Sequence, residues 1–166
     1  MWRLFACNPR LATTIIRFMF RAIAFLLIAA GGLQGQNTEP SKAHAQALCT
    51  VLFESSPQRS SRVNNEAKAC LDEVFLNARN HPDAMIFIVG NSAAGELNGT
   101  RLAAQRAVNV RDYLVSEKGL EESSVQVRSG ASQERTARTF LVPREAEFDL
   151  DVPGAKPVDQ RLVKPH

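Results

Sequence analysis

The chain has 166 residues and a formal net charge of +3, but that charge is unevenly placed. The first 36 residues hold four arginines and no acid, so the rest of the chain has a formal charge of −1. The basic isoelectric point of about 9.0 therefore comes from the N-terminal arginines and gives no support to a nucleic-acid partner.

The N-terminal segment has the arrangement of a secretory signal peptide. Arg17 and Arg21 precede an apolar run at residues 22–30, and small residues follow it. This run is shorter than the roughly 20 apolar residues that a membrane-spanning helix needs. We predict a signal peptide over residues 1–36, with Met19 as a possible true start, and a periplasmic protein of the cell envelope. The alternative is an uncleaved helix that anchors the protein in the inner membrane.

The next segment predicts a lead-in, a strand and a helix. Residues 37–47 are polar, and we expect a flexible lead-in there. Residues 49–54 alternate like a strand, with Cys49, Val51 and Phe53 on one face. A helix is predicted from a cap at Asn64 to about residue 80, because apolar residues recur at helical spacing. That apolar stripe contains Cys70.

Cys49 and Cys70 are the two cysteines that follow the predicted signal peptide. Two cysteines in an exported chain usually form one disulfide, which would join the first strand to the first helix. The alternative is a pair of buried thiols. We predict the disulfide.

The middle of the chain predicts a strand, a loop and a second helix. Residues 85–89 are continuously apolar, which indicates a central strand that is covered on more than one side or heavily buried. A loop of small residues follows at 90–95. The second helix is predicted to bury one face, and Gly119 is predicted to be its C-terminal cap. The apolar positions of that face are Ala103, Ala107, Val110 and Leu114.

Two short strands are predicted to complete the domain, at residues 124–128 and 139–142. From residue 144 the chain is charged and interrupted by prolines, so we expect a poorly structured tail over 144–166. The order of elements predicts an α+β fold over residues 48–143. It is a two-layer βαβαββ sandwich in which two helices pack on a small mixed sheet.

The sequence holds no recognisable catalytic motif. Nucleophile elbows and phosphate-binding glycine loops are missing from it, and its three histidines have no metal-ligand spacing. We therefore expect no enzymatic activity, no cofactor and no metal site.

The start of the second helix is the best candidate for an anion-binding site. Backbone amides at a helix N-terminus attract negative groups, and Arg101 and Arg106 lie in the first turns of this helix. Arginine binds a carboxylate through two parallel hydrogen bonds. The alternative is that both arginines are solvated on the helix surface and pair with Glu96 or Asp112.

The same region resembles a known family. The strand, the glycine loop and the pattern Leu102-Ala103-x-x-Arg106-Ala107-x-x-Val110-x-x-Tyr113-Leu114 resemble the OmpA-like domain, the peptidoglycan-binding C-terminal module of Gram-negative envelope proteins. The resemblance covers roughly residues 49–142. It implies the fold predicted above, a non-catalytic role and contact with peptidoglycan.

In that family an aspartate and the helix arginine hold the diaminopimelate of the stem peptide. Arg106 matches the arginine, but residues 91–93 read Asn-Ser-Ala where the family has His-Thr-Asp, so the aspartate is missing. Glu96 is the nearest acid that could replace it. Asn98 is displaced by one position from the family asparagine.

We predict a non-catalytic envelope protein that contacts the stem-peptide carboxylate of peptidoglycan or has a structural role in the envelope. The alternative is a module that has lost peptidoglycan binding and binds an envelope protein. The predicted ligand-binding residues are Asn91, Glu96, Asn98, Arg101 and Arg106.

Overall fold

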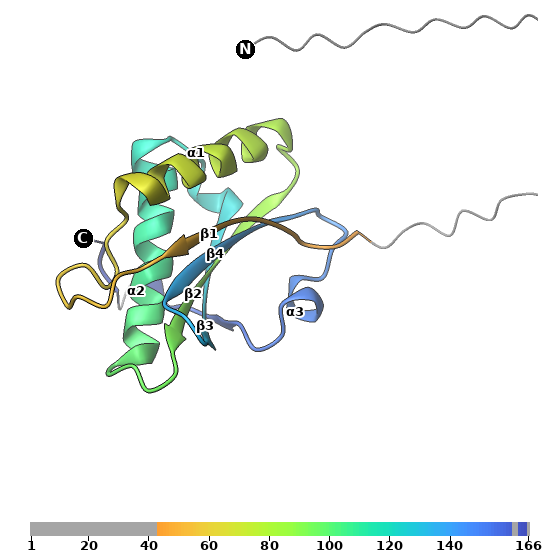
Figure 1. Cartoon of the computed structure of the whole chain (residues 1–166). Helices are drawn as coiled ribbons and strands as arrows, with labels where there is room; N and C mark the ends of the chain where they lie inside the picture. Colours follow the sequence, from red (N-terminus) through yellow and green to blue (C-terminus); the bar gives the residue numbers. More distant parts are fainter. Residues whose placement is uncertain (1–42, 161–162, 166) are drawn as a thin grey trace, which may run out of the picture. The chain divides into compact units, whose positions relative to one another are not determined.

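The computed structural model describes residues 43–160 and 163–165, which belong to one compact unit (Figure 1). The predicted signal peptide and most of the predicted lead-in lie outside the described residues. The strands are β1 (Gln46–Leu52), β2 (Met85–Ala93), β3 (Val125–Ser132), β4 (Thr136–Val142) and β5 (Lys156–Pro157). The helices are α1 (Asn65–Asn80), α2 (Gly99–Asp112), a π-helical turn (Tyr113–Glu117), a 3-10 turn (Glu122–Ser124) and α3 (Phe148–Asp151).

The strands form one mixed sheet in the order β1-β4-β2-β3-β5. β2 and β3 are parallel and joined through α2, whereas every other neighbouring pair is antiparallel. Helices α1 and α2 lie together on one face of the sheet, where their buried residues form the main core (Figure 1). The predicted α+β sandwich and its order of elements are confirmed, with the strands longer than predicted.

Helix α1 is capped and fastened at positions that the sequence indicated. The Asn64 side chain accepts a hydrogen bond from the Ala67 amide at 2.8 Å, which satisfies one of the free N–H groups of the first turn. Leu71 and Val74 then bury the apolar stripe. A disulfide joins Cys49 on β1 to Cys70 on α1, with 6.0 Å between the Cα atoms, so the predicted disulfide is confirmed.

Helix α2 packs very close to β2 because small residues face each other. A Cβ added at Gly90 would lie 1.9 Å from the carbonyl oxygen of Ala103 and 2.9 Å from the amide nitrogen of Ala107. No side chain larger than that of glycine fits there. The helix continues into the π-helical turn and ends at Gly119, whose φ is +80°, as predicted for its C-terminal cap.

The segment after residue 144 is structured, contrary to the prediction of a poorly structured tail. Phe148 of α3 is buried, stacked on Phe87 with ring centroids 4.1 Å apart and meeting Phe140 edge-on at 5.7 Å. These rings belong to a second apolar cluster, separate from the core under the helices. The prediction failed because one buried aromatic residue organises a segment whose composition is otherwise charged and rich in proline.

The second cluster explains the continuous apolar run of β2. Ile86 and Ile88 face the main core, whereas Phe87 and Val89 face the cluster around Phe148. Both faces of β2 are therefore covered, as predicted.

The N-terminal boundary also differs from the prediction. β1 begins at Gln46, inside the predicted lead-in of 37–47. Just before it, the Ala45 amide donates to the Asp151 carboxylate at 2.6 Å, and His44 lies 2.9 Å from the same side chain. The end of the lead-in is fixed because the C-terminal segment binds it.

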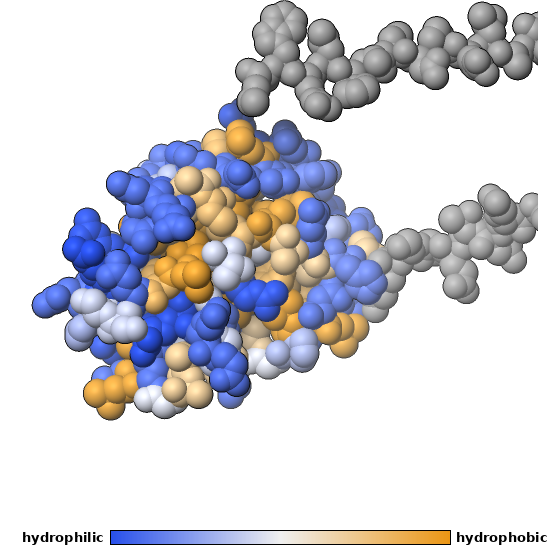
Figure 2. Space-filling view, in the orientation of Figure 1, coloured by the Kyte–Doolittle hydropathy of each residue, from blue (hydrophilic) through white to orange (hydrophobic). Residues whose placement is uncertain are grey.

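On the face drawn in Figure 2, apolar groups gather across the middle and are broken by polar groups. The large apolar side chains exposed in the described part are Leu52, Leu76, Leu97 and Leu150. Within the described residues, no helix combines the length and the apolar character needed to cross a bilayer.

Candidate functional site

Arg106 lies inside the protein, with none of its surface exposed. Its Nε donates to the carbonyl oxygen of Ser60 at 2.7 Å, and its Nη1 donates to the carbonyl oxygen of Asn91 at 2.7 Å. Nη1 and Nη2 also donate to the two carboxylate oxygens of Glu96, at 2.9 and 2.6 Å. Each of the three guanidinium nitrogens therefore bonds to the chain itself.

Glu96 is the hub of this arrangement. Its carboxylate side chain, only 6 % exposed, also accepts from Arg135 Nε at 2.9 Å and from the Ala93 amide at 3.1 Å. The hydrogen bond from Arg106 is the main reason why the pKa of Glu96 falls to about 2, against the opposing effect of burial. Glu96 is therefore ionised at neutral pH. The alternative to an anion-binding site was a solvated arginine paired with Glu96. The structure shows the pairing of Arg106 with Glu96, but Arg106 is buried rather than solvated.

The other predicted site residues are only partly brought together. Asn91 is buried beside Arg106, and its side-chain amide donates to the Thr136 hydroxyl at 3.1 Å. Asn98 adopts a left-handed conformation, with φ of +57°, before the first turn of α2 and makes no side-chain capping bond. Arg101 is exposed and forms no ion pair with any residue in the described ranges. Asn91, Glu96 and Arg106 thus form one buried cluster, and Arg101 stands outside it.

The buried polar residues of α2 hold the loop at residues 57–62 against the helix. Besides the bond from Arg106 to Ser60, the Asn109 side chain donates to the carbonyl oxygen of Ser61 at 2.7 Å. Two backbone carbonyls of the loop are therefore fixed by side chains of α2. This fixes the position of Arg62, the next residue, beside the helix.

A cavity of about 550 Å³, called groove A below, lies between this loop and the first turns of α2. It contains two arginines, Arg62 from the loop and Arg101 from the helix, and no acidic residue in the described part of the chain lines it. Its lining residues are Pro57, Gln58, Ser60, Ser61, Arg62, Arg101, Leu102 and Gln105. Gln105 also donates to the carbonyl oxygen of Lys164, so residues near the C-terminus reach the edge of the groove.

Arg62 was not among the predicted site residues. It lies in a loop whose composition carries no periodic signal, and only the fixed loop carbonyls bring it to α2. No pattern in a single sequence would have identified it.

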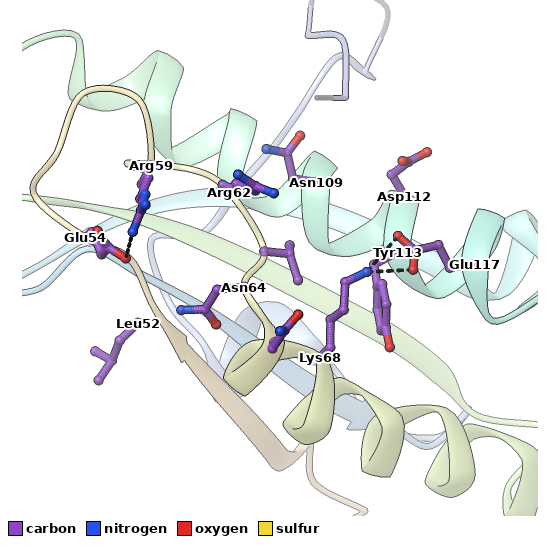
Figure 3. A pocket seen from close by; sticks show the side chains of 12 residues that line it. Leu52, Glu54, Arg59, Arg62, Asn64, Lys68, Asn109, Asp112, Tyr113 and Glu117 are labelled. Atoms are coloured by element: carbon purple, nitrogen blue, oxygen red, sulfur yellow. Dashed lines mark hydrogen bonds and ion pairs between the residues drawn. The ribbon is translucent and has the colours of Figure 1, made fainter.

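A second cavity of about 420 Å³, called groove B below, lies on the other side of Arg62, between α1, α2 and the end of β1 (Figure 3). Its charged residues are mixed in sign. Two ion pairs cross it, Arg59 with Glu54 at 3.5 Å and Lys68 with Glu117 at 2.8 Å. The lining residues are Leu52, Glu54, Arg59, Arg62, Val63, Asn64, Asn65, Lys68, Asn109, Asp112, Tyr113 and Glu117.

Over residues 43–160 and 163–165, no group of three histidine, cysteine, aspartate or glutamate side chains is placed to hold a metal ion. The chemistry of both grooves is that of ion pairing and hydrogen bonding.

The fold defines the class of protein, an α+β module in which two helices cover one face of a mixed sheet and α2 carries a buried arginine. The OmpA family model matches residues 57–145, more than half of the chain, and the protein belongs to the OmpA family. No curated protein is found to match the chain.

Two solved structures are similar to it. The crystal structure of the peptidoglycan-associated lipoprotein from Burkholderia pseudomallei has 24 % identity and a TM-score of 0.45, covering 56 % of this chain and 87 % of that chain. The OmpA-like domain of FopA1 from Francisella tularensis subsp. tularensis SCHU S4 has 10 % identity and a TM-score of 0.47, covering 75 % of this chain and 90 % of that chain.

Proposed function

We propose that this is a non-catalytic protein of the cell envelope that contacts peptidoglycan through groove A. The observation that carries the proposal is a cavity lined by Arg62 and Arg101, with no acidic residue among the described residues that line it. Peptidoglycan stem peptides carry carboxylates, and two guanidinium groups in a cavity whose described lining has no acidic residue favour such a ligand. Membership of the OmpA family supports this choice among anionic ligands.

Groove A has the dimensions and the construction of a small-ligand site. Its volume of about 550 Å³ lies in the usual range for ligand pockets, roughly 300–1,000 Å³. Its two arginines come from different elements, the loop at residues 57–62 and helix α2. In this proposal Arg106 acts indirectly, because it fixes the Ser60 carbonyl and with it the loop that carries Arg62.

A direct contact between Arg106 and a ligand would require Glu96 to leave. The ligand carboxylate would then replace Glu96 against Arg106, and Asn91 would form the wall of that site. Asn98 ends the loop that carries Glu96, so it would move with this loop. Groove A needs no such rearrangement and is therefore the preferred contact.

A role in protein interaction without peptidoglycan is the second candidate. Glu96 already forms an ion pair with Arg106, the residue that matches the ligand-binding arginine of the family. β1 is also an edge strand, and Leu52 at its end is 64 % exposed. An open strand edge can pair with a segment of another protein.

Co-sedimentation of the exported, purified protein with insoluble peptidoglycan sacculi tests the proposal. We expect the protein to sediment with sacculi and the double variant Arg62→Ala/Arg101→Ala to lose at least roughly fivefold in affinity, since two charge-assisted contacts disappear. Arg79→Ala, an exposed arginine near the end of α1, is the matched control and should sediment like the wild type.

Thermal unfolding of each variant must show that the fold is intact. Wild-type protein that sediments no better than an unrelated protein would contradict the proposal and favour the protein-interaction role. Unchanged sedimentation of the double variant would exclude groove A as the contact.

A further inference from the structure

We propose that a third cavity, called cavity C below, binds a small monocarboxylate with a compact apolar body, of the class of the aryl carboxylates. Cavity C has a volume of about 360 Å³ and lies between strands β2, β3 and β4 and the segment at residues 152–155. The inference goes beyond the proposed function and does not depend on it.

Cavity C lies on the face of the sheet that points away from α1 and α2. Val89 and Phe140, which line it, belong to the apolar cluster around Phe148 and not to the main core under the helices. Groove A, by contrast, lies against the first turns of α2, and it shares no lining residue with cavity C. A ligand in cavity C is therefore recognised by a separate set of side chains.

The walls of cavity C are mainly apolar. Val89 and Phe140 contribute the side of the sheet, whereas Val152, Pro153 and Ala155 contribute the side of the C-terminal segment. Sites for small organic ligands usually have such a lining, with a few polar groups that fix the orientation, and volumes of roughly 300–1,000 Å³. Cavity C therefore has the size and the character to enclose an apolar group.

Arg138 is the one charged residue among the described residues that line cavity C. It lies opposite Val89 in the β2–β4 ladder, so both side chains project from the same face of the sheet. Its guanidinium lies over the ring of Phe140, 5.0 Å from the ring centroid, and pairs with no acidic residue in the described part of the chain. A guanidinium that is stacked by one face keeps its N–H edge for a carboxylate.

The charge of the lining selects the class of ligand. The Asn91 amide adds no charge, and its nitrogen already donates to the Thr136 hydroxyl at 3.1 Å. A cationic ligand would meet Arg138 without compensation, and a ligand with several negative charges would place the others against apolar walls. One carboxylate on an apolar body matches both the single cation and the walls around it.

Three small probes test cavity C by NMR titration of the protein without residues 1–36, which retains its compact unit in full. They are benzoate, benzamide, which has nearly the same shape without the charge, and acetate, which lacks the ring. We expect benzoate to bind about two- to fivefold more tightly than benzamide, the gain typical of a solvent-exposed ion pair. Acetate should bind at least about tenfold more weakly than benzoate, because it buries no ring. The amide signals that move should be those of residues 130–132, 154 and 155.

The variant Arg138→Gln should lower the affinity for benzoate to that for benzamide and leave benzamide binding unchanged. Arg79→Gln is the matched control, because Arg79 is also exposed and also stacks on a phenylalanine ring, that of Phe75, at 5.7 Å. Arg79 lines neither cavity C nor grooves A and B, so this variant should bind benzoate like the wild type.

A second variant tests the apolar walls without touching the arginine. Ala155→Leu narrows cavity C from the side of the C-terminal segment, so it should weaken benzoate and benzamide by the same factor. Thermal unfolding of each variant must show that the fold is intact.

The outcomes also separate cavity C from groove A. If benzoate moves none of the signals of cavity C, or binds no more tightly than benzamide, the proposal is refuted. Unchanged benzoate binding in Arg138→Gln, or in Ala155→Leu, would refute it as well. The variant Arg62→Ala/Arg101→Ala should retain the benzoate shifts in cavity C, and their loss would place the ligand in groove A instead. Sedimentation with sacculi reports on groove A alone, so either proposal can fail while the other holds.

Discussion

At the residue scale, the pairing of Arg106 with Glu96 determines what the buried arginine does in this protein. A charged guanidinium without solvent contact is tolerated only when other groups satisfy it, and Glu96 with two backbone carbonyls does so. Arg135 adds a second cation to the same carboxylate and also donates to the Ser55 hydroxyl at 2.9 Å. The cluster thus ties together three loops at one end of the sheet.

We expect Glu96→Gln to lower the free energy of unfolding at neutral pH by about 3 kcal/mol, because Arg106 would stay charged and buried after losing its anionic partner. In the folded protein the pKa of Glu96 is about 2, well below the ordinary glutamate value of 4.5 that applies to the unfolded chain. The contribution of ionised Glu96 to the free energy of unfolding is therefore complete above pH 4.5 and is lost as the pH falls toward 2. Urea unfolding between about pH 2 and 7 should show the two proteins converging at acid pH. Glu73→Gln, which removes an exposed acid of α1, should follow the wild-type curve, and parallel curves for Glu96→Gln would contradict the prediction.

At the element scale, the contact between β2 and α2 depends on the absence of a side chain at Gly90. The clash predicted for a Cβ there is with backbone atoms of α2, which cannot move aside like the end of a flexible side chain. The same close approach places Arg106, one residue before Ala107, over the end of β2 and within reach of the Asn91 carbonyl.

Gly90→Ala should therefore destabilise the domain by about 3 kcal/mol, at the upper end of the usual cost of overpacking. Chemical denaturation monitored by circular dichroism would measure this loss. Thr50→Ala, at an exposed position of β1, serves as the control and should cost far less. A Gly90→Ala protein as stable as the Thr50→Ala protein would mean that α2 can shift away from the sheet.

A covalent link joins β1 to α1. The Cys49–Cys70 disulfide closes a loop with a sequence separation of 21 residues, for which chain entropy predicts a stabilisation of about 3 kcal/mol. The variant Cys49→Ala/Cys70→Ala should show this loss in urea unfolding without reductant. A thiol assay on the denatured, unreduced protein without residues 1–36 should find no free thiol, and finding two would refute the bond.

At the scale of the whole molecule, the sheet is covered on both faces, by α1 and α2 on one and by the C-terminal segment on the other. Phe148 is the centre of the second contact. Phe148→Ala should cost about 3 kcal/mol of unfolding free energy, as is typical for a buried aromatic residue. Leu150, two residues away in α3 and 64 % exposed, gives the matched control, since Leu150→Ala should change the unfolding midpoint only slightly. Equal effects of the two substitutions would show that α3 adds nothing to the core.

Much of this fold could be predicted because its main elements are long and periodic. The stripe of α1, the continuous run of β2 and the small-residue face of α2 each indicate their own structure. The disulfide was predicted from the presence of two cysteines in a chain expected to be exported, and the position of Cys70 on the apolar stripe agreed with it. The C-terminal segment could not be predicted, because α3 and β5 are too short to show a period. Phe148 anchors α3 in the core, and β5 is held by its pairing with β3.

The candidate site was less predictable than the fold. The sequence placed Arg101, Arg106 and Glu96 near one loop. Pairing of Arg106 with Glu96 was one of the two arrangements that it allowed. It could not show that Arg106 is completely buried, since burial depends on the loop at residues 57–62, which is distant in the sequence. Arg62 acquires its proposed role only when this loop lies along α2.

The bonds between Asp151 and the residues before β1 determine where mechanical load would enter the domain. Any tether that precedes residue 43 would pull first on the contacts of His44 and Ala45 with Asp151 and then on the antiparallel β1–β4 ladder. The disulfide at Cys49 would stop that ladder from peeling further. Leu52, at the far end of β1, borders groove B. It lies about 20 Å from the start of β1, because a strand rises by roughly 3.3 Å per residue. A domain held by its N-terminus would thus bear tension at one end of β1, away from both grooves.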